Sequence, residues 1–166
     1  MGAPLDFDTD RLTVRDWTAE LGSPPARARL ETELAEGLTP PVVAPLPPSL
    51  QMAADGVTGW IARQAREASV ATLRLRGGGD LVGLLIVSPQ QGAWHIGYLL
   101  MEPFWARGYA SEALRGLVRA APERQFRAGV AADNPASERV LIKAGFRRVS
   151  DGAMRLYARD PRARGD

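Results

Sequence analysis

The 166-residue sequence contains no cysteine and a single histidine, His95. Without cysteine the chain has no disulfide framework and no thiolate nucleophile, and a zinc site is improbable because such sites are built mainly from cysteine and histidine. The sequence also lacks a run of about 18 apolar residues, and its first residues lack a basic-then-apolar leader. These absences predict a cytoplasmic protein with no metal site and no membrane contact.

The sequence also has little excess of one charge sign over the other. The chain has 21 basic and 19 acidic residues, a net charge of +2, and Lys143 is its only lysine. A net charge of +2 is too small for the basic surface that binds nucleic-acid phosphates, so we expect no nucleic-acid partner. Hydrophobic residues make up 45% of the chain, as in ordinary globular proteins. The length predicts one domain, residues 1–166, with a core of its own.

Hydrophobic periodicity predicts an α/β fold with a mixed, mostly antiparallel twisted sheet and helices on both faces. The continuous apolar run 81–87 predicts a strand that is buried on both faces. The prolines of 39–49 predict an extended surface segment rather than a helix. The expected strands are 10–17, 70–76, 81–87, 93–101, 126–132, 146–150 and 153–159, and the expected helices are 25–38, 55–69, one that follows the loop at 104–108, and 135–144.

The stretch FWARGYASEAL, residues 104–114, places an arginine, a glycine and small residues where a helix begins. The first amides of a helix have no partner within it, and the helix dipole adds positive potential there, so this geometry suits an anion. The stretch lacks the lysine-serine pair of a P-loop and the spacing of a dinucleotide fingerprint. From these residues alone, a phosphate site and a tight strand-to-helix turn both remain open.

A second motif follows the strand at 126–132. Asn134 stands where an N-cap belongs, Pro135 follows at the first helical position, and Gly145 comes just after the expected last turn. These three residues predict a helix over 135–144.

Three stretches together resemble the GNAT superfamily of acyl-CoA-dependent N-acyltransferases, and more closely its ribosomal-protein N-terminal acetyltransferases. They are DTDRLTVRDW, HIGYLLMEPFWARGYASEAL and DNPASERVLIKAGF, and the matching motifs cover 10–17 and 81–147. The resemblance implies a GNAT-like fold with a CoA-binding core over 81–147 and acceptor-side helices over 18–69. It implies transfer of an acetyl group from acetyl-CoA to a primary amine, a protein N-terminus or a small molecule, by direct attack in a ternary complex.

The resemblance also implies which residues bind the cosubstrate. The CoA pyrophosphate would be held by backbone amides of the helix start, and the pantetheine arm would pair with a strand edge. Asn134 and Ser137 would lie beside that arm. The amides are those of Arg107, Gly108, Tyr109, Ala110 and Ser111, and the strand edge is that of Leu99, Leu100 and Met101.

Acyl transfer from a thioester to an amine needs a neutral amine and a proton for the leaving thiolate. His95 is the candidate base, with a histidine packed at a strand end as the alternative, and Glu102 is the second candidate. Many members of the superfamily carry a tyrosine as general acid at the position of Leu141. Here Ser137, one helical turn earlier, is the candidate acid.

Leu141 leaves room for a second hypothesis, an acyl-CoA-binding or sensing protein without turnover. A third is a protein that binds the phosphates of another nucleotide. The motifs leave open which amine is the acceptor, how long the acyl chain is, and whether the protein is a monomer or a homodimer.

Overall fold

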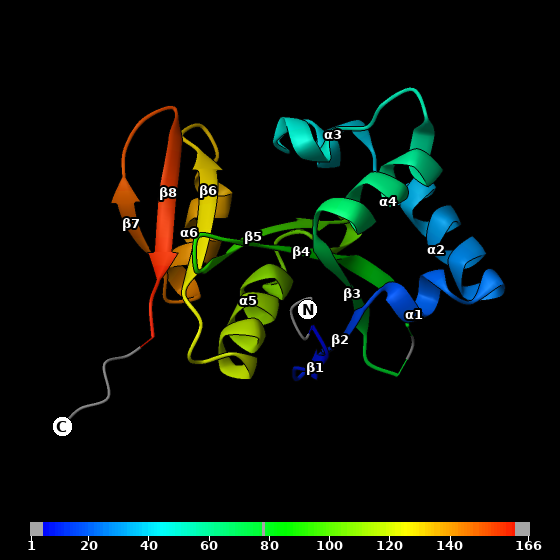
Figure 1. Ribbon diagram of the computed structural model, residues 1–166, viewed down its shortest axis with the longest axis horizontal. Helices are drawn as coiled ribbons and strands as arrows, with labels where there is room; N and C mark the ends of the chain where they lie inside the picture. The colour runs from blue at the N-terminus through cyan, green and yellow to red at the C-terminus, as the bar shows by residue number, and fades with distance from the viewer. Residues whose placement is uncertain (1–4, 78, 162–166) are drawn as a thin grey trace.

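The computed structural model describes residues 5–77 and 79–161. Within these residues eight strands form one sheet in the order β1-β2-β3-β4-β5-β6-β8-β7, as Figure 1 shows. Neighbouring strands are antiparallel except β5 and β6, which are parallel. The strands are β1 Phe7–Asp8, β2 Leu12–Asp16, β3 Ser69–Leu75, β4 Leu81–Gln90, β5 Ala93–Leu100, β6 Phe126–Ala131, β7 Arg147–Ser150 and β8 Met154–Arg159.

Helices cover both faces of the sheet and enclose two cores, which confirms the predicted fold class. One core joins the sheet to α5 and α6, and the other joins it to α2, α3 and α4. Along β4, Leu85 belongs to the first core and Leu84 to the second, so this strand is buried on both faces, as predicted. The helices are α1 Thr18–Leu21, α2 Pro24–Gly37, α3 Pro40–Val43, α4 Gly56–Glu67, α5 Tyr109–Ala120 and α6 Pro135–Lys143, with the 3-10 turns η1 Pro48–Leu50 and η2 Glu102–Phe104.

The prediction that 39–49 contains no helix is wrong. Residues Pro40–Val43 form α3, with proline in the first helical turn, where a missing N–H breaks no helical hydrogen bond. Val42 is buried and anchors this short helix in the core on the α2–α4 side. The prolines therefore start a helical turn here and only prevent a longer one.

The segment after α3 is fastened to α4 by side chains of that helix. Trp60 is fully buried, and its Nε1 donates to the carbonyl oxygen of Leu50 at 2.9 Å. Gln64 Nε2 donates to the carbonyl oxygen of Ser49 at 2.9 Å. The two helical residues hold η1 against the face of the sheet that α2–α4 cover.

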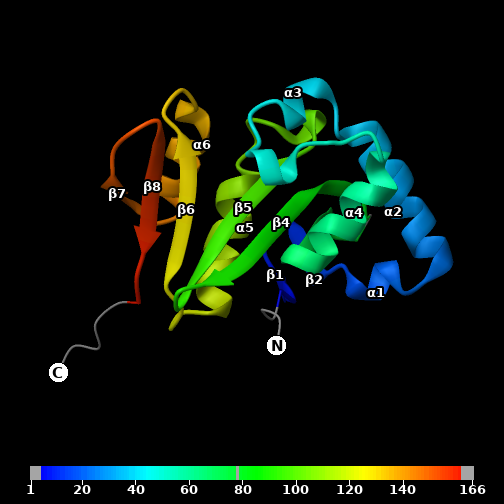
Figure 2. The same cartoon turned by 45° about the horizontal axis from the view of Figure 1, so that its top comes forward.

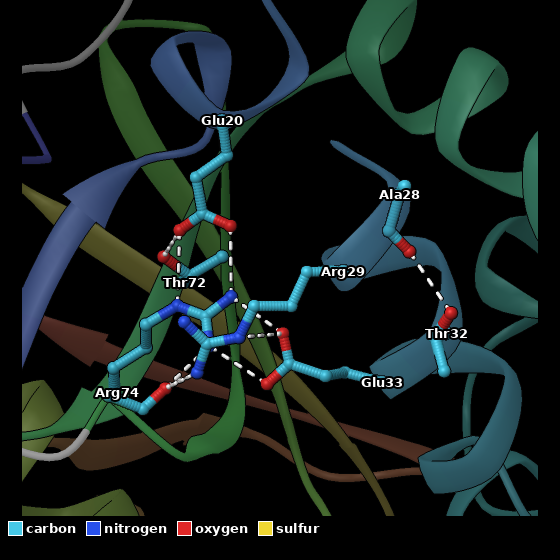
Figure 3. Close-up of polar contacts among 8 residues, drawn as sticks. Glu20, Ala28, Arg29, Thr32, Glu33, Thr72 and Arg74 are labelled. Carbon is cyan, nitrogen blue, oxygen red and sulfur yellow. Dashed lines mark hydrogen bonds and ion pairs between the residues drawn. The ribbon is translucent and has the colours of Figure 1, made fainter. Parts of the chain in front are cut away.

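Arg74 of β3 connects the first two helices to the sheet (Figure 3). Its guanidinium makes bidentate ion pairs with Glu20 of α1 and Glu33 of α2, with N···O distances of 2.9–3.1 Å. Its Nη1 also donates to the carbonyl oxygen of Gly79 at 2.7 Å. Burial works to lower the pKa of Arg74, but the hydrogen bonds and charges of Glu33 and Glu20 outweigh it and raise that pKa. Arg74 therefore remains a cation that fixes α1 and α2 on β3.

Candidate functional site

The sheet is forked between its two parallel strands. β5 and β6 pair only at Trp94 with Phe126 and at His95 with Arg127. Beyond these pairs β5 continues along β4 and β6 continues along β8. Figure 2 shows the two strands together at one end and spread apart toward the other. The fork therefore lies between the C-terminal halves of β5 and β6.

Alternation along β5 decides which backbone groups face the fork. Trp94 donates its N–H to the carbonyl oxygen of Gln125, toward β6, so the backbone groups of Ile96 and Tyr98 point the same way. Met101 instead donates its N–H to the carbonyl oxygen of Val82, next to β4.

The backbone groups of the predicted strand edge, Leu99, Leu100 and Met101, therefore do not all face the fork. Leu99 and Met101 turn their backbone groups toward β4, and their side chains are buried in the core beside α2–α4. Leu100 faces the fork, where its carbonyl oxygen accepts from Trp105 Nε1 at 2.8 Å. The sequence missed Ile96 and Tyr98 because the direction of a backbone group depends on which strands pair.

The loop before α5 is set by two left-handed residues. Ala106 has a φ of +58° and Gly108 a φ of +82°, a region that glycine adopts without steric cost. Gly108 is the N-cap of α5, and no side chain in the described part of the chain caps it. The first amides of α5 lack an intrahelical partner, so this end of the helix can receive an anion. The backbone conformation alone already accounts for a glycine at position 108.

The predicted pyrophosphate residues lie together at this helix start. Arg107 is exposed in the loop, and Ala110 and Ser111 are buried in the first turn of α5. Tyr109 is the first residue of α5 and is only 9% exposed. Its ring packs edge-on against Phe104, which explains its burial.

The loop before α5 is held in place by Thr9, Arg11 and Glu112, which the sequence did not indicate as part of the site. Arg11 Nη1 donates to the carbonyl oxygen of Arg107 at 3.0 Å, and its guanidinium lies 4.1 Å from the ring centre of Tyr109. Arg11 Nε also pairs with Glu112 of α5 at 2.7 Å, and Thr9 Oγ1 donates to the same carboxylate at 2.6 Å. Burial works to raise the pKa of Glu112, but the hydrogen bonds from Thr9 and Arg11 outweigh it and lower that pKa.

At the start of α6, on the other side of the fork, the predicted cap is confirmed. Asn134 Oδ1 accepts the backbone N–H of Ser137 at 3.2 Å. The Ser137 hydroxyl lies 2.6 Å from the phenol oxygen of Tyr98 on β5. Leu141, one turn further along α6, is 1% exposed in the core. The side chains of Tyr98 and Ser137 therefore meet across the fork.

The two predicted catalytic residues lie on opposite faces of the sheet. His95 follows the alternation of Leu99 and so points to the face covered by α2–α4, at the closed end of the fork. Ser137 and Tyr98 lie on the face covered by α5 and α6. His95 and Ser137 therefore lie near the fork on opposite faces of the sheet and do not contact each other.

Glu102, the second candidate base, is hydrogen-bonded to the start of α3. Glu102 is exposed at the start of η2 and accepts a hydrogen bond from the hydroxyl of Thr39, the N-cap of α3. This bond connects the start of α3 to the loop before α5.

A cavity of about 330 Å³ lies at the other end of the α5–α6 layer. The predicted site residues, all within the described part of the chain, do not line it. Its lining residues are Val118, Ala144, Gly145, Arg147, Ala158, Arg159 and Asp160.

Comparison with known proteins assigns the family. The sequence model described as "Acetyltransferase (GNAT) domain" matches residues 11–147, including the 18–69 region that carries none of the recognised motifs. No curated protein matches the chain. None of the helices in residues 5–77 and 79–161 has the length and apolar character to cross a bilayer.

Solved structures share the fold at low sequence identity. The ribosomal-protein-S5-alanine acetyltransferase of Vibrio fischeri has a TM-score of 0.68 and 16% identity, covering 94% of this chain and 96% of its own. The ribosomal L7/L12 alpha-N-protein acetyltransferase RimL, in complex with coenzyme A, has a TM-score of 0.64 and 17% identity, covering 92% and 96%. The aminoglycoside acetyltransferase AAC(6')-Ib, with coenzyme A and kanamycin, has a TM-score of 0.65 and 18% identity, covering 91% and 95%. With the family match over most of its length, the chain belongs to the GNAT acetyltransferase family.

Proposed function

We propose that the protein is an acetyl-CoA-dependent N-acetyltransferase that acetylates a primary amine. The observation that carries this proposal is the juxtaposition of a forked sheet with a helix start that no described side chain caps. The fork offers the backbone groups of Ile96 and Tyr98 to a chain of amides, and the start of α5 offers amides to an anion. Pantetheine carries amides and CoA carries a pyrophosphate, so both halves of the cosubstrate fit.

The structures of RimL and AAC(6')-Ib in complex with coenzyme A support this proposal. One acts on a protein N-terminus and the other is bound to kanamycin, so both acceptor classes stay open for this chain. In the proposed complex the amides of residues 107–111 hold the pyrophosphate, and Asn134 lies beside the pantetheine arm.

Acetyl-CoA supplies the acetyl group as a thioester. With that thioester in the fork, His95 on one face removes a proton from the amine, so that a neutral nitrogen attacks the carbonyl carbon. Ser137 on the other face donates a proton to the sulfur as the carbon–sulfur bond breaks. The two faces of the fork thus keep the entering amine and the leaving thiol apart.

The direct test is turnover with a panel of amines. The purified protein is incubated with acetyl-CoA and, in turn, peptides beginning with alanine or serine, spermidine and kanamycin. We expect release of free thiol that depends on one of these amines, together with a product heavier by one acetyl group. Binding of acetyl-CoA without turnover of any amine would contradict the enzyme and favour an acyl-CoA-binding protein.

A further inference from the structure

The phenol of Tyr98 crosses the fork at the point where the leaving thiol is proposed to lie. Tyr98 is three residues beyond the last pairing of β5 with β6, and its side chain is half-buried. Its hydroxyl oxygen lies 2.6 Å from Ser137 Oγ in the first turn of α6. Such a short O···O distance marks a strong hydrogen bond between two hydroxyls.

Through this hydrogen bond Tyr98 places a phenol beside α6, which contains no tyrosine of its own. Leu141 faces the core from α6, is 1% exposed and has no proton to donate. Ser137 lies one turn earlier on the same face of the helix, and its backbone N–H is held by Asn134. An isolated serine hydroxyl rotates freely and is a weak acid, so it needs a second group to orient it.

We infer that Tyr98 is a positioning residue of the acetyl transfer, whose phenol donates to Ser137 Oγ and directs the serine proton toward the leaving sulfur. This inference rests on the proposed function. A phenol is a far stronger acid than an aliphatic alcohol, so the phenol is the donor of the pair. Ser137 Oγ accepts that bond, and its own proton is then available to the sulfur. A donated hydrogen bond also makes the acceptor hydroxyl a better donor.

The phenol of Tyr98 can donate only while it carries its proton. Burial raises the pKa of Tyr98, and the hydrogen bond with Ser137 offsets part of that rise. The phenol therefore keeps its proton at neutral pH and stays a donor.

The proton balance of the step is closed. The bond between the amine nitrogen and the carbonyl carbon forms, and the carbon–sulfur bond breaks. The sulfur takes the proton of Ser137 Oγ, which takes the Tyr98 proton, and solvent restores the phenol. The amine gives up two protons to solvent, one through His95 before the attack and a second from the nitrogen once the new bond has formed. Two protons therefore leave the nitrogen, one arrives at the thiol, and one is released overall.

The test is a double-mutant cycle of Tyr98→Phe and Ser137→Ala, with Tyr157→Phe as the matched control. Tyr157 is a fully buried tyrosine of β8 outside the fork, so its substitution removes a buried hydroxyl from the same sheet. The rate of thiol release is measured with the panel amine that the wild type acetylates fastest, and CoA affinity is measured by calorimetry.

We expect Ser137→Ala to lower kcat about 100-fold, as for loss of a general acid. Tyr98→Phe should lower kcat about tenfold with CoA affinity unchanged, and the double variant should be no slower than Ser137→Ala. Tyr157→Phe should keep the wild-type kcat.

Three results would overturn the inference. Wild-type kcat in Tyr98→Phe would show that the phenol takes no part, and a double variant slower by the product of both losses would show that the phenol does not act through Ser137. An equal loss in Tyr157→Phe would show a merely structural effect. A wild type that acetylates none of the amines would instead overturn the proposed function, and the inference with it.

Discussion

Glu112 joins two segments of the chain that are about one hundred residues apart. Its carboxylate accepts hydrogen bonds from Thr9 Oγ1, from the Arg11 backbone at 2.8 Å and from the Arg11 guanidinium at 2.7 Å. Through Arg11 it also fixes the carbonyl of Arg107, in the loop before α5. The side chain therefore connects the first strands to the proposed pyrophosphate site.

Because the pKa of Glu112 is lowered in the folded protein, its contribution to stability depends on pH. The contribution is complete above the ordinary carboxyl pKa of about 4.3 and is lost as pH falls through the lower pKa of the folded state. We expect Glu112→Gln to lower the free energy of unfolding by about 1 kcal/mol at pH 7, the order of a charge-assisted hydrogen bond. Urea unfolding from pH 7 to pH 3 should show the gap between wild type and variant closing below about pH 4.

The control for this experiment is the same substitution in an Arg11→Met background. There Glu112→Gln should cost less at pH 7, because the cation that it pairs with is gone. A gap that stays constant down to pH 3 would contradict the proposed linkage.

For single side chains, the sequence predicts features that depend on near neighbours. The Asn134 cap was predicted because an N-cap needs only the residues of its own helix turn. The Arg11–Glu112 pair and the Tyr98–Ser137 pair could not be predicted, since each joins residues brought together only by the pairing of distant strands. The fork-facing groups of Ile96 and Tyr98 escaped prediction for the same reason.

Among the elements, α1 and α2 depend most on one side chain. Arg74 is only 12% exposed, and its loss would leave Glu20 without a cation and Glu33 with only the exposed Arg29, at 3.4 Å. We expect Arg74→Ala to lower the free energy of unfolding by about 2 kcal/mol, less than for a fully buried pair. Urea denaturation measures the change.

Arg15 is the matched control for this prediction. It pairs with Asp8 at 3.0 Å on the surface, where both side chains are more than 40% exposed. Arg15→Ala should cost no more than about 0.5 kcal/mol because water screens exposed ion pairs. Similar losses for the two variants would show that Arg74 does not hold the helices.

The long periodic elements were predicted, and the very short β1 and α1 were not. The helix predicted over 25–38 is α2, and the helix predicted over 135–144 is α6, within one residue at each end. β1 has two residues and α1 has four, too few for any hydrophobic period to emerge. The error at α3 came from treating every proline as a helix breaker, although the first helical turn tolerates it.

For the whole molecule, the decisive feature is one sheet that two helical layers share. The layer of α2–α4 covers one face of this sheet and the layer of α5 and α6 covers the other. The motifs predicted the fold class and the family because three of them occur in the order of a GNAT protein. The layer of α2–α4 carried no motif, and the contacts by which Trp60 and Arg74 hold the helices on this face depend on the tertiary structure.

A CoA site at the start of α5 can be tested by thermal stability with acetyl-CoA, CoA, ATP and NAD. The measurement compares wild type, Gly108→Glu and Gly92→Glu. Gly92 has a φ of +79°, close to that of Gly108, and a Cβ there would meet no described atom within 4 Å. The control therefore carries the same charge change and a similar backbone strain, in the turn between β4 and β5.

A ligand that binds only the folded state raises the melting temperature by mass action. Acetyl-CoA or CoA at about one hundred times its dissociation constant should raise that of the wild type by roughly 5 °C or more. We expect this rise with acetyl-CoA and CoA but not with ATP or NAD, and we expect Gly92→Glu to retain it and Gly108→Glu to lose it. No rise in the wild type, or an equal rise in Gly108→Glu, would contradict a CoA site at the start of α5.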